Sequence, residues 1–349
     1  MRLQLFNYKL PVELIAQNPP KKRSDARLMV VHRDTGLIEH RKFTDIIDYV
    51  NTEDVFMVND SYMLNNLIFG QKQNSSIQIC VYLLREVDVD NYIWDIEADP
   101  ARKVRVGNKL YFKDIDAIGE IIDNTSVRGR MIKFITNKSS EEFRKEIVNK
   151  GLTRLPKYIK RFPNADDLKY TKSFFAKKTG SINHVISGLH FDEKLVLQMK
   201  LKGIHIESLT YNINDFPTNK FSTKTVNNCK RIPEFFFIKP EVIDLINTKK
   251  QQGSRVFATG YSTLMGLENA YNPALDKLSD VNEIVLKTVF NRNDFNVCDG
   301  YLTNFYEPGS MFLIVDTAFC GEELLTKAYQ EAIKEKYNFL LFGDSLLII

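Results

Sequence analysis

The stretch GSINHVISGLHFD, residues 180–192, predicts a sharp turn that leads from a strand into a helix. Asp192 is a common helix N-cap residue, and the apolar periodic run that follows it stops at Gly203, a residue typical of helix ends. A turn of this kind points free backbone N–H groups outward, so such junctions often hold ligands. His190 lies one turn before the predicted helix and is either a functional side chain or a packed one.

Strands and helices alternate from this corner to the end of the chain. The periodicity predicts strands at residues 203–211, 255–259, 300–305 and 339–349. It predicts further helices at residues 240–252, 262–270, 311–320 and 322–337. Proline stands at the first position of one of them, Pro240, where its missing N–H is tolerated. Alternation of this kind predicts an α/β domain with its ligand site at the strand ends.

Residues 65–137 differ from the rest, because their apolar residues alternate with polar ones instead of recurring at helical spacing. Short strands separated by regular turns are typical of a small barrel or sandwich. Ser139 and Glu142 then form a capping-box pattern that begins a helix running to Gly151. The sequence therefore predicts two domains: a discontinuous α/β domain at residues 1–64 and 151–349, and an inserted all-β domain at residues 65–150.

The composition is that of an ordinary globular protein, with 44% hydrophobic and 26% charged residues in 349. No apolar run is long enough to span a bilayer, and the N-terminus lacks a signal-peptide pattern. The four cysteines lie far apart and form no Cys-x-x-Cys pair, which argues against a zinc site or a disulfide framework. We therefore expect a cytoplasmic, soluble monomer that needs no metal and contacts no membrane.

Basic residues gather in one segment, although the net charge is only +4. Residues 150–178 contain nine lysines and arginines against two acids, with aromatic residues between them. A segment of this composition is suited to phosphates and stacked bases, and its alternative interpretation is a solvated surface loop. The candidate nucleic-acid-binding residues are Arg154, Lys157, Lys160, Arg161, Lys172, Lys177 and Lys178.

Several short motifs occur in one order over nearly the whole chain. They are Leu10-Pro11 with Leu14-Ile15-Ala16-Gln17, Arg23-Ser24 with Ala26-Arg27-Leu28, Asn59-Asp60, Leu155-Pro156 with Tyr158-Ile159, Gly188-Leu189-His190-Phe191, Leu302-Thr303-Asn304-Phe305 with Pro308 and Ser310, and Gly343-Asp344. Each motif is weak alone, but together they are specific. On these motifs the chain resembles the S-adenosylmethionine:tRNA ribosyltransferase-isomerase family, the QueA enzymes of queuosine biosynthesis.

The resemblance implies an α/β domain that carries an inserted β-barrel. It also implies that S-adenosylmethionine donates a ribosyl unit to a 7-deazaguanine in the tRNA anticodon, where the unit is rearranged to an epoxide while adenine and methionine leave. His190 would handle a proton or orient the ligand, and the basic segment would contact the anticodon stem-loop. The residues expected to bind S-adenosylmethionine are Asn59, Asp60, Gly188, Leu189, Gly260, Thr303 and Asn304.

The chain departs from the family pattern at several site positions. Tyr62 and Tyr306 stand where the family has an arginine and a histidine, Tyr211 lies in a loop that lacks the family's two glycines, and Tyr261 follows Gly260. These aromatic residues predict either a refilled pocket or core packing. They also keep an alternative open: a repurposed relative with little or no parent activity, which binds RNA, the ribosome or a protein partner, or acts on a different nucleoside.

Overall fold

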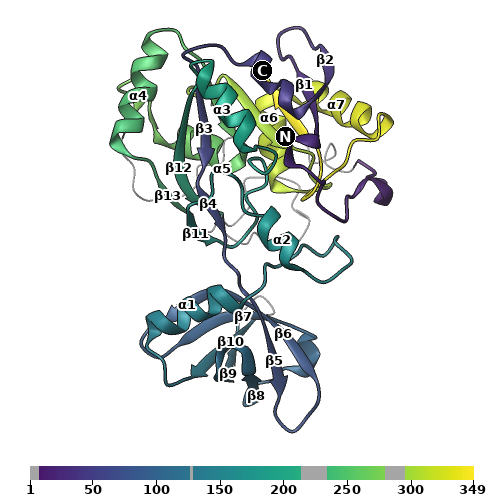
Figure 1. Ribbon diagram of the computed structural model, residues 1–349, viewed down its shortest axis with the longest axis vertical. Helices are drawn as coiled ribbons and strands as arrows, with labels where there is room; N and C mark the ends of the chain where they lie inside the picture. The colour runs from purple at the N-terminus through teal and green to yellow at the C-terminus, as the bar shows by residue number, and fades with distance from the viewer. Residues whose placement is uncertain (1–7, 126–128, 214–233, 280–294) are drawn as a thin grey trace. The chain divides into compact units, whose positions relative to one another are not determined.

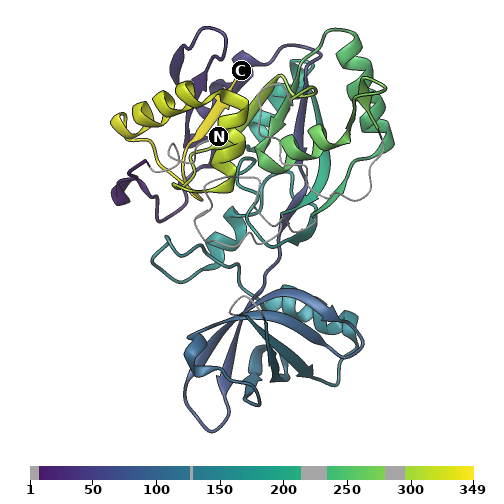
Figure 2. The same cartoon turned by 180° about the vertical axis from the view of Figure 1, so that it is seen from behind.

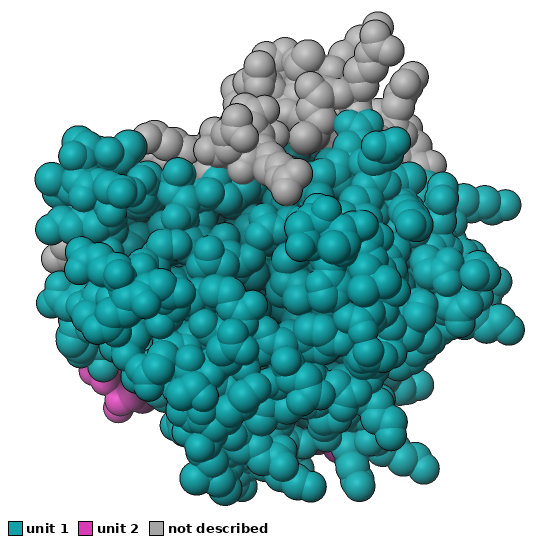
Figure 3. Space-filling view, turned by 90° about the horizontal axis from the view of Figure 1, so that it is seen from above, with its two compact units in different colours: residues 1–63, 157–161, 169–349 teal, residues 64–156, 162–168 magenta. Residues whose placement is uncertain are grey.

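The computed structural model describes residues 8–125, 129–213, 234–279 and 295–349, which form two compact units (Figure 1). Figure 3 colours unit 1 teal and unit 2 magenta. Unit 1 comprises Met1–Met63, Lys157–Arg161 and Lys169–Ile349, and unit 2 comprises Leu64–Pro156 and Phe162–Leu168. The units are defined by contact density, so the expected boundaries of independently folding domains, 1–64 with 151–349 and 65–150, stay a prediction.

Unit 1 is built on one eight-stranded mixed sheet. In spatial order its strands are β13 (Phe235–Phe237), β12 (His205–Asn212), β3 (Val55–Asn59), β14 (Val256–Thr259), β17 (Gly300–Asn304), β18 (Ser345–Ile348), β1 (Arg27–Val31) and β2 (Ile38–Lys42). The four neighbours β12, β3, β14 and β17 run parallel. Their carboxyl ends therefore meet at one edge of the sheet, the place where α/β proteins bind ligands.

Both faces of this sheet are covered. Along β3, Val55 and Met57 belong to one apolar cluster while Phe56 and Val58 belong to the other, as the two-residue period of a strand requires. Helix α3 (Glu193–Leu201) packs in the cluster on one face, and the remaining long helices pack in the other, as the two opposite views show (Figures 1 and 2). These are α4 (Pro240–Gln251), α5 (Gly260–Ala270), α6 (Met311–Cys320) and α7 (Glu322–Lys334).

Smaller elements complete unit 1. They are the 3-10 helices η2 (Val12–Leu14), η3 (Arg23–Asp25) and η4 (Phe43–Tyr49), the short helix α2 (Ala165–Tyr170), the parallel pair β4 (Ser61–Met63) and β11 (Lys178–Ser181), and the antiparallel pair β15 (Tyr271–Asn272) and β16 (Lys277–Leu278). Of helix α2, residues 165–168 are assigned to unit 2 and residues 169–170 to unit 1. Within the described residues, no helix is both long and apolar enough to cross a membrane.

Unit 2 is a closed antiparallel barrel, which confirms the fold class that the sequence predicts. Its strands, in order around the barrel, are β10 (Arg130–Ile135), β7 (Ile93–Asp99), β6 (Gln78–Asp88), β5 (Leu67–Lys72), β8 (Lys109–Phe112) and β9 (Ala117–Asn124), with the 3-10 turns η5 (Ala101–Lys103) and η6 (Lys113–Ile115). Gly70 and Gly119 both face Phe112, where an added Cβ would lie 2.8 Å from the ring. The barrel interior therefore requires glycine at these two positions.

The helix caps confirm the predicted starts. Asp192 accepts a hydrogen bond from the N–H of Leu195 at 2.9 Å, which begins α3. Ser139 and Glu142 form the expected capping box at the start of α1 (Ser140–Lys150), whose Phe143 packs into the barrel core. These bonds satisfy N–H groups that a helix leaves unpaired in its first turn.

The last strand is shorter than predicted: β18 begins at Ser345, whereas the sequence predicted a strand from residue 339. The Asp344 carboxylate accepts hydrogen bonds from the N–H groups of Arg27 and Asn338, each at 2.7 Å. Because these bonds fold residues 338–344 into a turn, apolar character alone overestimates the length of the strand.

Candidate functional site

Asn59 ends strand β3 and joins it to its neighbours. Its amide nitrogen donates to the Tyr211 carbonyl and the Ser262 hydroxyl, each at 2.9 Å. Its amide oxygen accepts from the N–H of Ser61 at 2.9 Å and of Tyr211 at 3.1 Å. These bonds use both donors and both acceptor positions of the amide. In this structure the Asn59 side chain fixes the strand ends and has no polar atom left for a ligand.

Asp60 connects the sheet edge to the basic segment. Its carboxylate accepts a hydrogen bond from the Thr210 hydroxyl at 2.7 Å. Its backbone oxygen accepts from the N–H groups of Lys177 at 2.7 Å and Lys178 at 3.0 Å. The side chain is buried, with 6% of the residue surface exposed. Asp60 therefore positions two of the candidate cations through their backbone.

A small cavity of about 30 Å³ lies at the carboxyl edge of the parallel strands. Its lining residues are His184, Val185, Ile186, Ser187, Ile213, Gly260, Tyr261, Ser262, Tyr306 and Phe312. This volume holds a water molecule or two. Of the residues expected to bind S-adenosylmethionine, Gly260 lines the cavity. Gly188 and Leu189 are buried and directly follow the lining residue Ser187 in the sequence.

Gly260 is where backbone conformation matters most at this cavity. It begins α5 directly after strand β14 with φ +83°, a left-handed conformation that side chains other than glycine rarely adopt. An added Cβ would lie 3.1 Å from the Ser187 hydroxyl oxygen. Thr259, the N-cap residue, makes no capping hydrogen bond with its side chain. The positive end of the α5 helix dipole therefore lies at the cavity, where it favours an anionic group.

Two of the four aromatic replacements line the cavity. The Tyr261 and Tyr306 rings contact Phe312 from two sides, with centroid distances of 5.1 and 4.9 Å. Tyr211 packs behind Tyr261, and its hydroxyl donates to Glu234 at 2.5 Å. Tyr62 instead lies under the Lys172 ammonium, 4.6 Å from the ring centroid. Tyr261 and Tyr306 thus form part of the cavity wall, Tyr211 packs in the core, and Tyr62 lies against a lysine. Both a filled pocket and core packing therefore account for these aromatic residues.

His190 forms a buried polar pair with Asn304. The Asn304 amide nitrogen lies 3.5 Å from His190 Nε2 and donates to the Asp344 carbonyl at 3.2 Å. Burial lowers the pKa of His190 to about 4, so the imidazole is neutral at pH 7. Within the described residues, His190 Nδ1 and the Asn304 side-chain oxygen have no hydrogen-bond partner. His190 belongs to the Gly188–Phe191 corner, and neither residue of the pair lines the cavity.

Thr303, the neighbour of Asn304 in β17, turns to the opposite face of the sheet. Its hydroxyl lies 3.3 Å from the Asp316 carboxylate and 3.5 Å from the Tyr306 hydroxyl. Thr303 is fully buried. Thr303 is connected to the cavity through Tyr306. Thr303 and Asn304, both expected to bind the ligand, therefore contact different groups on opposite faces of the sheet.

Arg23 is a positioning residue that the sequence analysis did not single out as functional. Its guanidinium donates to the carbonyl oxygens of Leu189 and Tyr170 at 2.8 Å, Lys172 at 2.7 Å and Lys169 at 2.9 Å. Burial lowers its pKa. The bonds hold the corner that carries His190 against part of the basic segment. In the sequence, the Arg23-Ser24 motif was the feature that could have indicated a role for this residue.

The candidate nucleic-acid-binding residues fall into two groups. Arg154, in unit 2, pairs with Glu97 and lies 4.5 Å over the Tyr82 ring. Arg161 donates to the Gln17 carbonyl at 3.0 Å. Both arginines, like Lys172, are partly buried by these contacts. The exposed cations are the lysines of unit 1: Lys157, Lys160, Lys177 and Lys178.

No group of three or more histidine, cysteine, aspartate or glutamate side chains in the described part of the chain could hold a metal ion. Cys80, Cys298 and Cys320 are free thiols. Burial raises the pKa of the Cys298 thiol well above its usual range, so it is protonated and unreactive at neutral pH.

Comparison with known proteins identifies relatives along the entire chain. Residues 3–348 match the family described as "Queuosine biosynthesis protein". A protein of Amoebophilus asiaticus called S-adenosylmethionine:tRNA ribosyltransferase-isomerase is 39% identical over 349 residues, which cover 100% of both chains. A protein of Flavobacterium psychrophilum with the same name is 37% identical over 350 residues, again with full coverage of both.

One solved structure has the same fold. It is the crystal structure of S-adenosylmethionine tRNA ribosyltransferase from Thermotoga maritima, which is 27% identical, with a TM-score of 0.53. The match covers 99% of this chain and 100% of that one. The family match, the full-length relatives and the shared fold agree along the chain from end to end. The protein described here therefore belongs to the queuosine biosynthesis protein family.

Proposed function

We propose that the protein is a transferase-isomerase that uses S-adenosylmethionine as ribosyl donor to a 7-deazaguanine in tRNA, in queuosine biosynthesis. The observation that carries this function is the full-length identity of 35–39% to proteins named for that reaction. Both the barrel and the mixed sheet belong to the matched length. We expect the protein to act as a monomer in the cytoplasm on the anticodon stem-loop.

The cavity at the start of α5 is the proposed site of S-adenosylmethionine. The positive end of the α5 helix dipole, where Gly260 lines the cavity, suits the carboxylate of its methionine part. The aromatic faces of Tyr261, Tyr306 and Phe312 suit a sulfonium cation. At about 30 Å³ the cavity is smaller than the ligand, so binding requires these aromatic side chains to move apart.

The remaining site residues have proposed supporting roles. His190 is neutral at pH 7 and accepts from Asn304, so we assign it to orienting the Asn304 amide. The Asn304 side-chain oxygen is a buried acceptor that has no partner in the described structure, and a ligand donor would satisfy it. Asn59 and Asp60 hold the strand ends that frame the cavity. Gly188 and Leu189 form the corner that Arg23 fixes.

The exposed lysines of unit 1 are the proposed contacts to the tRNA backbone. Lys157, Lys160, Lys177 and Lys178 are all exposed. The Lys160 ammonium donates to the Lys157 carbonyl at 2.8 Å, and the Lys178 ammonium lies 5.2 Å from the Phe237 ring centroid. Lysines of this kind bind phosphates as point charges without reading sequence. Arg154, Arg161 and Lys172 carry charge in the same segment, but their side chains are held by protein partners.

The direct test is a ribosyl-transfer assay. Purified protein is incubated with S-adenosylmethionine and tRNA that carries the aminomethyl-deazaguanine, and released adenine is measured together with label transferred from the ribosyl carbon atoms. The matched control is the same tRNA with guanine at that position. Adenine and labelled tRNA should form only with the modified tRNA. Absence of both products, with protein that is folded by circular dichroism, would refute the proposed function.

A further inference from the structure

Helix α6 contains a carboxyl group in the middle of an apolar sequence, MFLIVDTAFC. Asp316 is fully buried there. Burial raises its pKa well above the usual range, and no cation within the described residues acts on it. An isolated carboxylate in such a place is strongly unfavourable, whereas a neutral carboxylic acid is tolerated. Burial therefore favours the protonated form of Asp316.

A chain of hydroxyl groups leads from this acid to the cavity. The Thr303 hydroxyl lies 3.3 Å from Asp316 Oδ1 and 3.5 Å from the Tyr306 hydroxyl. The Ser187 hydroxyl is the next polar group, close enough to the Tyr306 hydroxyl to interact with it. Ser187 and Tyr306 both line the cavity, and Ser187 faces Gly260. Four side chains from three separate parts of the sequence thus connect a buried acid with the cavity wall.

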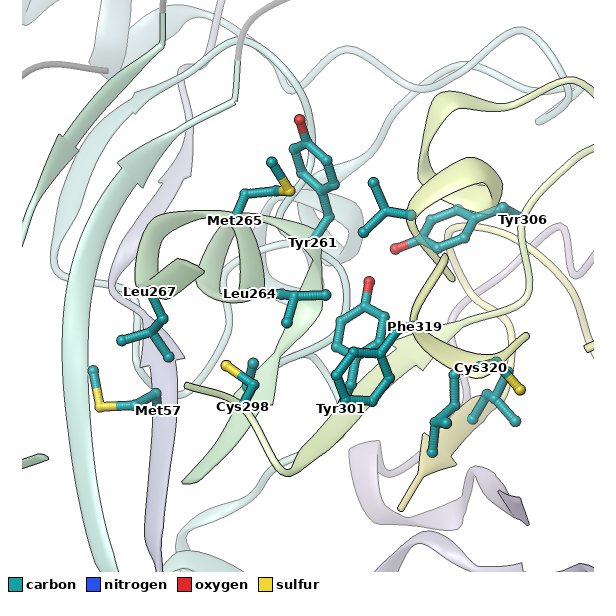
Figure 4. Packing of buried hydrophobic residues seen from close by; sticks show 14 of the residues in the cluster. Met57, Tyr261, Leu264, Met265, Leu267, Cys298, Tyr301, Tyr306, Phe319 and Cys320 are labelled. Atoms are coloured by element: carbon teal, nitrogen blue, oxygen red, sulfur yellow. The ribbon is translucent and has the colours of Figure 1, made fainter. Parts of the chain in front are cut away.

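The other groups around the acid are also uncharged. Tyr301 faces the Asp316 carboxyl, and Figure 4 shows the hydroxyl ends of Tyr301 and Tyr306 pointing toward one another. The Tyr329 hydroxyl accepts a hydrogen bond from the Tyr306 N–H at 3.0 Å. Burial raises the pKa of all three tyrosines far above neutral. Burial therefore disfavours ionisation of every group in this cluster, and the groups interact as hydrogen-bonding partners.

Two tyrosines that do not belong to this series of hydroxyl groups hold the Tyr306 backbone. Tyr8 donates its hydroxyl to the Tyr306 carbonyl oxygen, and Tyr329 accepts from the N–H. With the backbone fixed, the direction of the Tyr306 hydroxyl depends on the groups at its tip, the Thr303 hydroxyl at 3.5 Å and the nearby Ser187. Asp316 Oδ2 still lacks a hydrogen-bond partner of normal geometry among the described groups. A side chain with this open polar atom is not needed for packing.

We propose that Asp316 is a positioning residue that acts as a neutral acid through Thr303 and holds the Tyr306 and Ser187 hydroxyls toward the cavity, where they bind a hydrogen-bonding group of the nucleoside substrate. That the nucleoside is S-adenosylmethionine rests on the function proposed above. Asp316 does not touch the ligand itself. A valine at this position would pack in the helix without burying a polar group. Asp316→Val should therefore keep or raise stability while it weakens ligand binding.

The experiment compares variants that separate charge, hydrogen bonding and packing. Asp316→Asn keeps a neutral hydrogen-bonding group of the same shape, whereas Asp316→Val removes it. Tyr306→Phe removes the next hydroxyl in the chain. Thr317→Val is the matched control, because the buried Thr317 hydroxyl in the same helix bonds only to the Leu313 carbonyl of its own helix. Binding of S-adenosylmethionine is measured by calorimetry, and unfolding by thermal melting.

The expected results follow from the proposal that a neutral Asp316 acts through Thr303 on the Tyr306 and Ser187 hydroxyls. Asp316→Val and Tyr306→Phe each weaken binding about tenfold, and the double variant is no weaker than either one, because both interrupt the same chain. Asp316→Asn and Thr317→Val stay within about threefold of the unchanged protein. Asp316→Val melts at the same or a higher temperature. Infrared spectra of the unchanged protein show the carbonyl stretch of a protonated acid, which is lost in Asp316→Asn.

Three results would overturn the proposal: equal loss of binding in Asp316→Asn and Asp316→Val, additive losses in the double variant, or no protonated-acid band. Should Asp316→Val fail to fold, the comparison of Asp316→Asn with Tyr306→Phe and the infrared band decide the matter. If the unchanged protein binds S-adenosylmethionine but releases no adenine with modified tRNA, the proposed function fails while the binding comparison still stands. The two ideas can thus fail separately.

Discussion

Gly260 faces Ser187 so closely that a Cβ at Gly260 would lie 3.1 Å from the Ser187 hydroxyl oxygen. The two residues are far apart in sequence and form adjoining parts of the cavity wall. Gly260 also has φ +83°, which places it in the left-handed region. The close approach and the backbone conformation are independent reasons for glycine at this position.

Replacing Gly260 separates these two reasons when it is compared with Gly253. Both glycines have φ +83°, but nothing lies within 4 Å of a Cβ at Gly253. Gly253→Ala should lower the free energy of unfolding by about 1 kcal/mol through backbone strain alone. Gly260→Ala should cost about 1 kcal/mol more because Ser187 must move, and it should weaken binding of S-adenosylmethionine. Chemical denaturation and calorimetry measure the two effects; equal stability and unchanged binding in both variants would contradict this role of the cavity.

The buried imidazole of His190 predicts a loss of stability in acid. Its pKa is lowered to about 4 in the folded protein, against about 6.5 when unfolded. The unfolded chain therefore binds a proton more readily between these values, and stability falls as pH drops below about 6.5. From pH 7 to pH 5 the contribution is about 2 kcal/mol. Denaturation curves of His190→Gln should lose that part of the pH dependence; a curve parallel to that of the unchanged protein would contradict it.

The sequence predicted the fold well because its signals are local. The Asp192 cap and Pro240 at the first position of α4 each determine an element from neighbouring residues alone. Alternation in the middle of the chain predicted the barrel for the same reason. The end of the chain was less predictable, because Asp344 folds residues 338–344 into a turn through a bond to distant Arg27.

The site was only partly predictable, because it depends on contacts between distant segments. Gly260 was expected from the family resemblance and does line the cavity. Nothing local indicates that Asn59 has all its hydrogen bonds satisfied by Tyr211, Ser61 and Ser262. Asp316 was hidden in a run that predicted simply a buried helix. The roles of these polar residues follow from their partners, and partners of this kind are set by tertiary packing.

Arg23 should contribute to both stability and ligand binding. Lysine at this position keeps the charge but cannot reproduce a planar group that reaches four carbonyl oxygens at once. Arg23→Lys should lower the free energy of unfolding by about 2–4 kcal/mol and weaken binding of S-adenosylmethionine, because the corner at Leu189 loosens. Arg41→Lys is the control, since Arg41 is exposed and its replacement should leave the unfolding curve nearly unchanged. Similar unfolding curves for the two variants would contradict the assignment.

The exposed lysines of the basic segment should determine the salt dependence of tRNA binding. Replacing all four, Lys157, Lys160, Lys177 and Lys178, with alanine removes four ammonium groups. If each contacts a phosphate, the slope of log affinity against log salt should fall by about 3, with large loss of affinity at low salt. Binding of S-adenosylmethionine should not change, because none of these residues lines the cavity.

A charge-matched control distinguishes a specific surface from general attraction of a polyanion. The control replaces four exposed lysines on two other helices and their ends: Lys194, Lys200, Lys327 and Lys336. Both variants lose the same net charge, so long-range attraction falls equally in both. Filter binding over a range of salt concentrations should show a reduced slope only in the first variant. Equal slopes in the two would mean that tRNA does not contact the segment at residues 157–178, and the assignment of those four lysines would be wrong.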